Sequence, residues 1–347
     1  MAEQPARTRI ALALGSGGAR GYAHIGAIQV LDERGFEIIA IAGSSMGALV
    51  GGLRAAGKLD EYTEWALGLS QLDVLRLLDP SLSAAGAIRG QKVFAKVGEL
   101  FDGALIEDLP VPYTAVAADL LARREVWFQS GPIAAAIRAS ISIPGVFTPV
   151  MLNGRLLADG GLMNPVPIAP TVGVHADATV AVSLSGDRRT SDVGPPTSES
   201  AEERPVEEWA ERFRRSAANL FDRDVIRTFM GRFGANRGGE DADGDDGVED
   251  LDAVVLDGQP HDAAPLFDDL PHGLGKGDVI AQSIEAMQTV LSRYRLAGYP
   301  PDVLVSVPRD ACRSLDFHRA AEMIELGRAA TEDALEAAGL DPVRAHH

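Results

Sequence analysis

Three short segments of the sequence combine small residues with groups that could carry out acyl transfer. One of them, Gly43-Ser44-Ser45-Met46-Gly47, is a G-x-S-x-G pattern between a predicted strand and a predicted helix. A sharp turn there would expose the Ser45 hydroxyl above a sheet, with the N-terminus of the following helix directed at any developing negative charge. The context favours Ser45 as a nucleophile, although glycine-rich helix starts without any catalytic role also have this pattern.

A glycine-rich loop comes earlier in the chain, at Gly15-Ser16-Gly17-Gly18-Ala19-Arg20-Gly21, where a predicted strand turns into a helix. Consecutive glycines let backbone N–H groups point outward at the positive end of a helix dipole, which makes an anion site. The loop is not of the Rossmann type, because Arg20 takes the last glycine position of G-x-G-x-x-G, and a Walker A lysine is also missing. Tight strand-to-helix packing alone is the other interpretation.

The third segment, Leu156-Leu157-Ala158-Asp159-Gly160-Gly161, places a carboxylate at the end of a short apolar run. Asp159 could reach a serine hydroxyl there, although Asp-Gly is also an ordinary turn sequence. Of the seven histidines, His24 and His318 are the two candidates for a base. Packing or hydrogen bonding is the more common role on a helix face, where His24 lies, and local capping explains His318 equally well. A histidine-based triad remains open on the residues alone.

The elements that must position these segments alternate between apolar runs and helical patterns. A strand at 9–15 and a helix at 22–31 are followed by a strand at 38–42 and a helix at 46–56. This alternation requires parallel strand pairing. Further helices are predicted near 59–69, 72–79, 89–101 and 132–142, and further strands near 112–119, 124–129 and 178–184. We expect an α/β layered fold with a mainly parallel central sheet and helices on both faces.

The chain divides into three expected regions. Residues 9–186 form the core, and residues 187–277 form a linker, a helix at 206–233 and an acidic, flexible insertion at 240–269. The third region, 278–340, carries two helical patterns and a strand that pack back on the core. The helix at 206–233 has aromatic residues among arginines, so it could lie in a lipid interface or pack as a cap over the site. The cap is favoured because no other membrane feature is present.

Composition and charge limit the classes of function. The chain has 347 residues, 46% apolar and 24% charged, which is enough for one large core or two ordinary ones. A formal charge of −18 argues against nucleic acid as a partner. Because residues 240–269 contribute −12 of this charge, the remainder carries only −6 and is weakly repelled by a lipid surface. A calcium loop starting at Asp241 would need Gly at position 246 and Glu at position 252, where Asp stands at both, so solvated charge is expected.

The same sequence contains no apolar run long enough to span a membrane, and Ile10 to Leu14 is too short for the core of a signal peptide. A single cysteine, Cys312, suits a reducing compartment. We therefore expect a cytoplasmic protein that is able to contact a membrane peripherally.

Taken in order, the three segments resemble those of the patatin-like phospholipases, particularly the stand-alone bacterial members. The flanking residues agree as well: Ala23-His24-Ile25-Gly26, Ala139-Ser140-Ile141-Ser142-Ile143-Pro144-Gly145 and Asn164-Pro165-Val166-Pro167. The resemblance covers residues 9–186 and returns more weakly around 302–338.

The resemblance implies a Ser-Asp dyad in place of a triad. Ser45 would be the nucleophile, Asp159 the base, and the backbone N–H groups of Gly17, Gly18 and Ala19 the oxyanion hole. The residues that would line the site are Gly15, Ser16, Arg20, Gly21, Gly43, Met46, Gly47, Gly160 and Gly161. Ser16 stands where members often have glycine. Arg20 would either attract an anionic intermediate or a lipid phosphate, or fix the loop by hydrogen bonds to carbonyl groups.

The expected reaction is hydrolysis of a lipid ester, of the phospholipid or lysophospholipid class, through an acyl-enzyme on Ser45. No metal or cofactor is implied, and no protein partner is identified. The alternative is a non-catalytic acyl-binding or regulatory protein that uses the same core, with the acidic segment at 240–269 as an interaction tail.

Overall fold

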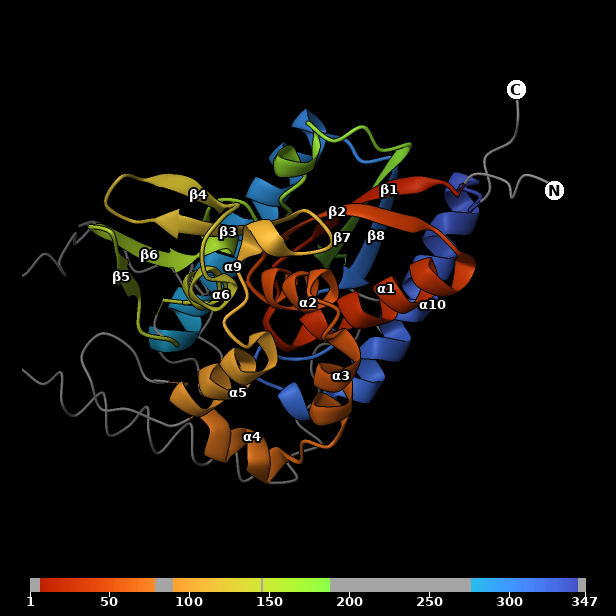
Figure 1. Cartoon of the computed structure of the whole chain (residues 1–347). Coiled ribbons are helices and arrows are strands. Elements are labelled where there is room, and N and C mark those ends of the chain that lie inside the picture. Colours follow the sequence, from red (N-terminus) through yellow and green to blue (C-terminus); the bar gives the residue numbers. More distant parts are fainter. Residues whose placement is uncertain (1–6, 79–89, 145, 188–275, 343–347) are drawn as a thin grey trace, which may run out of the picture. The chain divides into compact units, whose positions relative to one another are not determined.

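The computed structural model of the chain describes residues 7–78, 90–144, 146–187 and 276–342. Nearly all of these residues belong to one compact unit, Met1–Ala201 with Ile280–His347. The helix predicted at 206–233 and the acidic segment at 240–269 lie outside the described residues. Figure 1 shows the arrangement of the helices and strands described below.

One eight-stranded sheet forms the centre of this unit, in the order β5-β6-β3-β2-β1-β7-β8, with β4 paired to β3 off this path. The strands are β1 (Arg9–Leu14), β2 (Glu37–Ser44), β3 (Tyr113–Asp119), β4 (Arg124–Phe128), β5 (Val150–Leu152), β6 (Arg155–Asp159), β7 (Ala178–Gly186) and β8 (Val303–Pro308). The pairs β1-β2, β1-β7, β2-β3 and β7-β8 are parallel, whereas β3-β4, β3-β6 and β5-β6 are antiparallel. The prediction of a mainly parallel sheet is confirmed, with an antiparallel end that was not foreseen.

Helices cover both faces of the sheet (Figure 1). They are α1 (Ala23–Arg34), α2 (Met46–Ala55), α3 (Leu59–Leu67), α4 (Gln71–Leu78), α5 (Gln91–Phe101), α6 (Ile133–Ser140), α9 (Lys276–Gly298) and α10 (Ala320–Ala338). The helices α1 to α6 lie within a few residues of their predicted positions, and α9 and α10 account for the two helical patterns of the region 278–340. One local difference is the 3-10 helix η1 (Gly18–Tyr22), which leads into α1. At its other end α1 stops at Gly35, whose φ of 89° is the left-handed conformation that ends helices.

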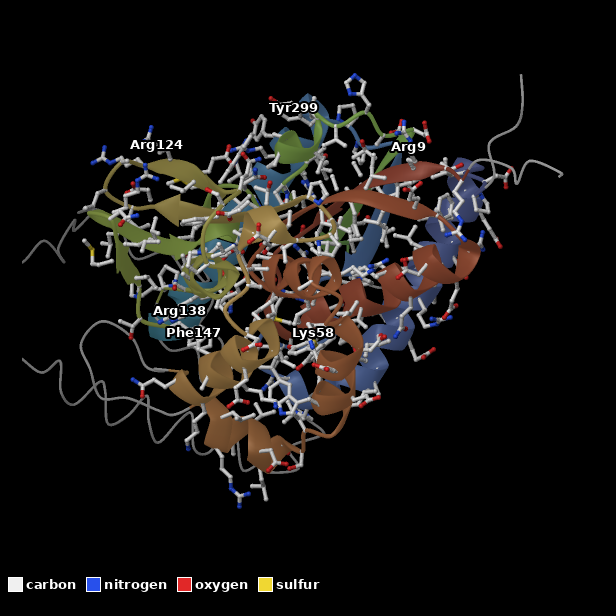
Figure 2. The ribbon with its side chains drawn as sticks, in the orientation of Figure 1. Arg9, Lys58, Arg124, Arg138, Phe147 and Tyr299 are labelled. Carbon is white, nitrogen blue, oxygen red and sulfur yellow. The ribbon has the colours of Figure 1, made fainter. Side chains whose placement is uncertain are left out.

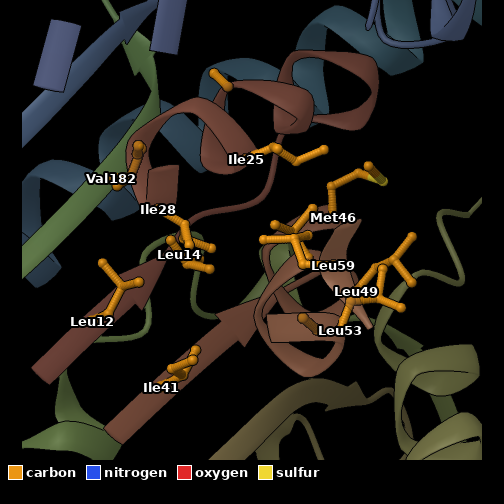
Figure 3. Packing of buried hydrophobic residues seen from close by; sticks show 14 of the residues in the cluster. Leu12, Leu14, Ile25, Ile28, Ile41, Met46, Leu49, Leu53, Leu59 and Val182 are labelled. Carbon is orange, nitrogen blue, oxygen red and sulfur yellow. The ribbon is translucent and has the colours of Figure 1, made fainter. Parts of the chain in front are cut away.

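The alternation of large and small residues along β1 separates the two layers of the core. Leu12 and Leu14 face the side covered by α1, where they pack with Ile28 (Figure 3). Ala13 points to the opposite face, where Leu296 of α9 packs against its cluster. Burying a leucine or isoleucine side chain contributes roughly 1.5–3 kcal/mol. This packing therefore holds both ends of the glycine loop between β1 and α1.

The edge of β3 brings the ends of two other strands together. Ser44 at the end of β2 pairs with Val116, and Asp159 at the end of β6 pairs with Ala117, the next residue of β3. Both partners lie on the same edge, because β4 occupies the other edge of β3. Since β2 is parallel and β6 antiparallel to β3, their C-terminal ends meet. Residues far apart in the sequence are thereby placed next to each other.

Candidate active site

Ser45 occupies a strained turn between β2 and α2. Its backbone has φ 56° and ψ −123°, a conformation that residues with a side chain rarely adopt. The Ser45 N–H donates to Ser140 Oγ at 2.9 Å, and the Ser45 carbonyl accepts hydrogen bonds from the N–H groups of Ala48 and Leu49. Such a turn, fixed from both sides, is typical of a nucleophile at a strand-to-helix junction.

The two glycines of the G-x-S-x-G pattern are required by close backbone packing. A Cβ atom on Gly43 would collide with the carbonyl of Gly47, and one on Gly47 would collide with the carbonyl of Leu14. Neither collision can be relieved by rotating a side chain, because the atoms that are struck belong to the backbone. The pattern therefore reflects how tightly the turn is pressed against β1.

The hydroxyl of Ser45 donates a hydrogen bond to Asp159 Oδ2 at 2.5 Å, and both residues are buried. Asp159 Oδ1 accepts the N–H of Gly161 at 2.7 Å. Burial raises the pKa of Asp159 from its usual 3.8 to about 6, against the opposing effect of the hydrogen bonds from Ser45 and Gly161. At neutral pH Asp159 is therefore ionised and placed to accept the proton of Ser45.

Gly17 and Gly18 carry the amides that remain available in the glycine loop. Within the described residues neither N–H has a hydrogen-bond acceptor, and Gly18 lines the same cavity as Ser45. Gly18 has φ +58°, and a Cβ atom on it would collide with Ser314. The prediction of Ala19 as a third oxyanion donor does not agree with this geometry. The Ala19 N–H donates to the Ser314 carbonyl at 2.9 Å, because the chain after β8 passes over the loop.

Arg20 fixes the glycine loop from behind. Its Nε donates to the Gly17 carbonyl at 3.2 Å, and its Nη1 donates to Glu285 at 3.1 Å and to the Arg309 carbonyl. Only 8% of Arg20 is exposed. Of the two roles considered for this side chain, the structure therefore favours holding carbonyl groups over attracting an anion.

The buried His24 also stabilises the loop. Its Nε2–H donates to the Gly15 carbonyl at 2.7 Å, and burial lowers the pKa of His24 to about 4, so the ring is neutral at physiological pH. His318 lies in the 3-10 helix η5 (Phe317–Arg319). The hydrogen bond to Gly15 confirms the hydrogen-bonding role predicted for His24. The Ser45 hydroxyl donates to a carboxylate and to neither histidine.

The first residues of the loop are held by the neighbouring strand and turn. Gly15 donates its N–H to the Val182 carbonyl at 2.9 Å, and Ser16 donates its N–H to the Pro165 carbonyl at 2.8 Å. The Ser16 side chain occupies the space into which a Cβ atom on Gly161 would project. Serine fits at position 16 because residue 161 has no side chain.

The remaining predicted site residues close the gaps between these turns. A Cβ atom on Gly21 would collide with Met46, and one on Gly160 would collide with the carbonyl of Val116. Met46 itself follows Ser45 and lines the cavity beside it. All fourteen predicted site residues thus belong to three turns that are packed against each other.

A cavity opens directly beside Ser45. It measures about 650 Å³ when the open solvent at its mouth is included, and its walls come mainly from α2 to α5 and from Ile141, Ile143 and Phe147. The lining is hydrocarbon and aromatic; wall residues include Leu49, Tyr62, Trp65, Val74 and Phe94. Phe94 packs edge-on against Phe147 with ring centres 5.6 Å apart, and Arg138 stacks over Phe94 at 4.2 Å (Figure 2 labels Arg138 and Phe147).

Within the described ranges, no three side chains of His, Cys, Asp or Glu gather into a group that could hold a metal ion. None of the helices in the same ranges is long and apolar enough to cross a membrane.

Two contributions to the site were missed by sequence reasoning. Ser140 holds the nucleophile turn by accepting the N–H of Ser45, and the Ser314 carbonyl accepts the N–H of Ala19. Ser140 lies at the end of the largely apolar helix α6, where a polar residue is a detectable signal. Nothing in the sequence around Ser314 indicates its place over a loop some 300 residues earlier.

Comparison with known proteins places this geometry in a family. A model of the patatin-like phospholipase family matches residues 12–172. Over 340 residues the chain is 51% identical to uncharacterised NTE family proteins of Mycobacterium tuberculosis and Mycobacterium bovis, which covers 96% of this chain and 93% of each relative. The chain belongs to the patatin-like phospholipase family.

Two more distant similarities were also found. A patatin-like phospholipase domain-containing protein of Caenorhabditis elegans is 34% identical over 189 residues, which is 52% of this chain and 14% of that protein. The solved structure of VipD from Legionella pneumophila matches with a TM-score of 0.46 at 16% identity, covering 96% of this chain and 67% of that chain. In this patatin-like phospholipase family member, α9, β8 and α10 lie beyond the residues that the family model matches.

Proposed function

We propose that the protein is a serine acyl-hydrolase that cleaves carboxylic esters of lipids, of the phospholipid or lysophospholipid class. The observation that carries the proposal is the 2.5 Å hydrogen bond from Ser45 Oγ to the buried carboxylate of Asp159, made at the wall of an apolar cavity. Membership of the patatin-like phospholipase family supports the same reaction class.

In the first half of the reaction, Ser45 Oγ attacks the ester carbonyl carbon while Asp159 takes the hydroxyl proton. The N–H groups of Gly17 and Gly18 stabilise the oxyanion, and the N-terminus of α2 adds a positive potential. Collapse of the tetrahedral intermediate expels the alcohol, which receives the proton from Asp159. The acyl group then remains on Ser45.

In the second half, Asp159 takes a proton from a water molecule that attacks the acyl-enzyme. The second tetrahedral intermediate collapses, the carboxylic acid leaves, and the proton returns to Ser45 Oγ. Each proton that Asp159 accepts is given back within the same half-reaction, so the side chain ends the cycle as a carboxylate. Its pKa of about 6 suits this exchange near neutral pH.

The apolar cavity accounts for the acyl side of the substrate. Burying a hydrocarbon chain against wall side chains such as Leu49 and Val74 is favourable. These side chains offer no hydrogen-bond partner to a polar chain. An ester carbonyl placed at Ser45 would direct its acyl chain along these walls. The alcohol and head group would then remain toward the mouth, where the protein contacts the lipid surface peripherally.

The test is hydrolysis of p-nitrophenyl esters of medium-chain acids. Replacing Ser45 by Ala should lower kcat by about 10⁴- to 10⁶-fold, as for other serine nucleophiles. Ser183→Ala is the matched control, because Ser183 is also buried but lies on strand β7, which β1 separates from β2 in the sheet. Activity that survives Ser45→Ala would disprove the proposal. A fluorophosphonate probe that fails to label Ser45 in the folded protein would favour a non-catalytic acyl-binding protein instead.

A further inference from the structure

Helix α9 contacts two separate turns of the site from outside. Arg295 donates through Nη2 to the Met163 carbonyl at 3.1 Å and through Nη1 to Glu125 at 3.2 Å. Ten residues earlier on the helix, Glu285 accepts a hydrogen bond from Arg20 at 3.1 Å. None of these contacts reaches the cavity, so they act on the backbone that carries the reacting groups.

The contact made by Arg295 closes a ring of hydrogen bonds around the turn that follows Asp159. Asn164 is 1% exposed and donates from its side chain to the second oxygen of Glu125 at 2.7 Å. The carbonyl of Asn164 accepts the hydroxyl of Ser44 at 2.6 Å. Because Ser44 immediately precedes the nucleophile, this ring ties the turn carrying the base to the turn carrying Ser45.

The contact made by Glu285 acts on the opposite side of the site. Arg20 donates both to Glu285 and to the carbonyl of Gly17, and the amide of Gly17 is one of the two available donors in the glycine loop. Ten residues of α-helix span about 15 Å, and a helix packed on a core changes little in length. The spacing of Arg295 and Glu285 on α9 thus sets the distance between their two points of attachment.

We infer that α9 is a positioning helix for the reaction at Ser45, in which Arg295 holds the turn of Asp159 and Glu285 holds, through Arg20, the glycine loop. The inference rests on the proposed function. Arg295 is a positioning residue, since it touches neither substrate nor reacting atoms. Its planar fork serves two acceptors in different directions, which a lysine ammonium does not reproduce at the same geometry.

The experiment compares Arg295→Ala, Arg295→Lys and the control Arg293→Ala in the full chain. Arg293 lies on the same helix with its side chain 74% exposed, so the control removes the same charge and stem without touching the ring. The measured quantities are the second-order rate constant for fluorophosphonate labelling of Ser45 and the fraction of protein labelled at completion.

For Arg295→Ala we expect labelling to slow by roughly 10- to 100-fold, the range produced by small displacements of reacting groups. The labelled fraction should stay complete, kcat for an ester should fall with KM unchanged, and Arg295→Lys should not restore the rate. Arg293→Ala should label at the wild-type rate. Glu285→Gln should have a smaller effect, because Arg20 keeps its bonds to the Gly17 and Arg309 carbonyls.

Two results would overturn the inference while the proposed function stands: a wild-type labelling rate for Arg295→Ala, or a reduced labelled fraction in which the remaining protein reacts at the wild-type rate. The latter would assign Arg295 to folding alone. If Ser45 of the wild-type protein is not labelled, the proposed function fails and the inference falls with it.

Discussion

The two parts of the site differ in how they are held together. The polar ridge, made of residues 15–21, 43–47 and 159–164, is fixed by backbone hydrogen bonds and by contacts at glycines that leave no space for a Cβ atom. The apolar cavity beside it is bounded by side chains of α2 to α5 and by Ile141, Ile143 and Phe147. The ridge thus sets the geometry of the reaction, whereas the cavity selects the substrate. We expect changes in one part to leave the property set by the other unchanged.

The largest expected effect is on the ridge. Asp159→Asn removes the group that accepts the Ser45 proton and should lower kcat/KM by roughly 10²- to 10⁴-fold, the range for loss of a general base. The ratio of rates for a medium-chain and a short-chain ester should not change, because the cavity is untouched. Steady-state kinetics on both esters measure the two quantities.

Asp119→Asn is the matched control for this variant. Asp119 is also buried at the end of a strand, but its carboxylate accepts the N–H groups of Leu121 and Ala122 in a turn. It should cost stability and leave kcat near the wild-type value. A changed chain-length ratio in Asp159→Asn would show that ridge and cavity are not independent.

The ridge was largely predictable from sequence, and the reason is local. Strand, glycine turn and helix follow each other within a few residues at Gly15 and again at Gly43, so short-range patterns place Ser45 and the loop. The residues around Asp159 identify it as a candidate base, but they do not show that it lies beside Ser45. Its position depends on β6 pairing antiparallel with β3 on the edge that β2 also uses, and no local pattern records that pairing.

The cavity was not predictable in the same way. Leu49, Trp65 and Phe94 are ordinary apolar residues of amphipathic helices, and they become neighbours only because α3 packs against α2, and α5 against α4 and α6. The place of Ser314 over the glycine loop is equally invisible, because β8 and the chain after it are brought there by the sheet. Contacts between distant segments, rather than residue types, account for what was missed.

Filling the cavity should have the next largest effect. This effect should be on the selectivity for acyl-chain length. Val93→Trp on α5 occupies room for several methylene groups, each contributing about 0.8 kcal/mol of binding free energy. We expect kcat/KM for a long-chain ester to fall roughly 10- to 100-fold while that for a short-chain ester is retained. Ala95→Trp, at an exposed position of the same helix, is the control. Equal losses on both esters would place the acyl chain elsewhere.

The pH dependence of activity belongs to the ridge. Because Asp159 must be ionised and its pKa is about 6, kcat/KM should fall about tenfold per pH unit below that value. His24 cannot account for this acidic limb of the pH profile, since its pKa is about 4. A pH series of kcat/KM, supported by the rate of fluorophosphonate labelling, measures the midpoint. A midpoint near 4 would assign the limb to another group.

The smallest expected effect is on stability, where Asp159 and His24 act in opposite directions. The raised pKa of Asp159 makes a stabilising contribution to the free energy of unfolding that is present below pH 3.8 and lost as the pH rises through about 6. The lowered pKa of His24 gives a contribution that is present above pH 6.5 and lost as the pH falls through about 4. Shifts of this size correspond to roughly 3 kcal/mol each, so the two should nearly cancel between pH 4 and 6.5.

Asp159→Asn leaves the contribution of His24 unopposed. The free energy of unfolding of this variant should therefore rise between pH 4 and 6.5, whereas that of the wild-type protein should stay nearly level. His24→Gln should give the opposite slope, because His24 then no longer offsets the contribution of Asp159. Urea unfolding across this pH range measures both slopes. Parallel curves for the three proteins would mean that Asp159 and His24 are not buried as the structure shows, whereas opposite slopes would assign this part of the pH dependence to these two groups.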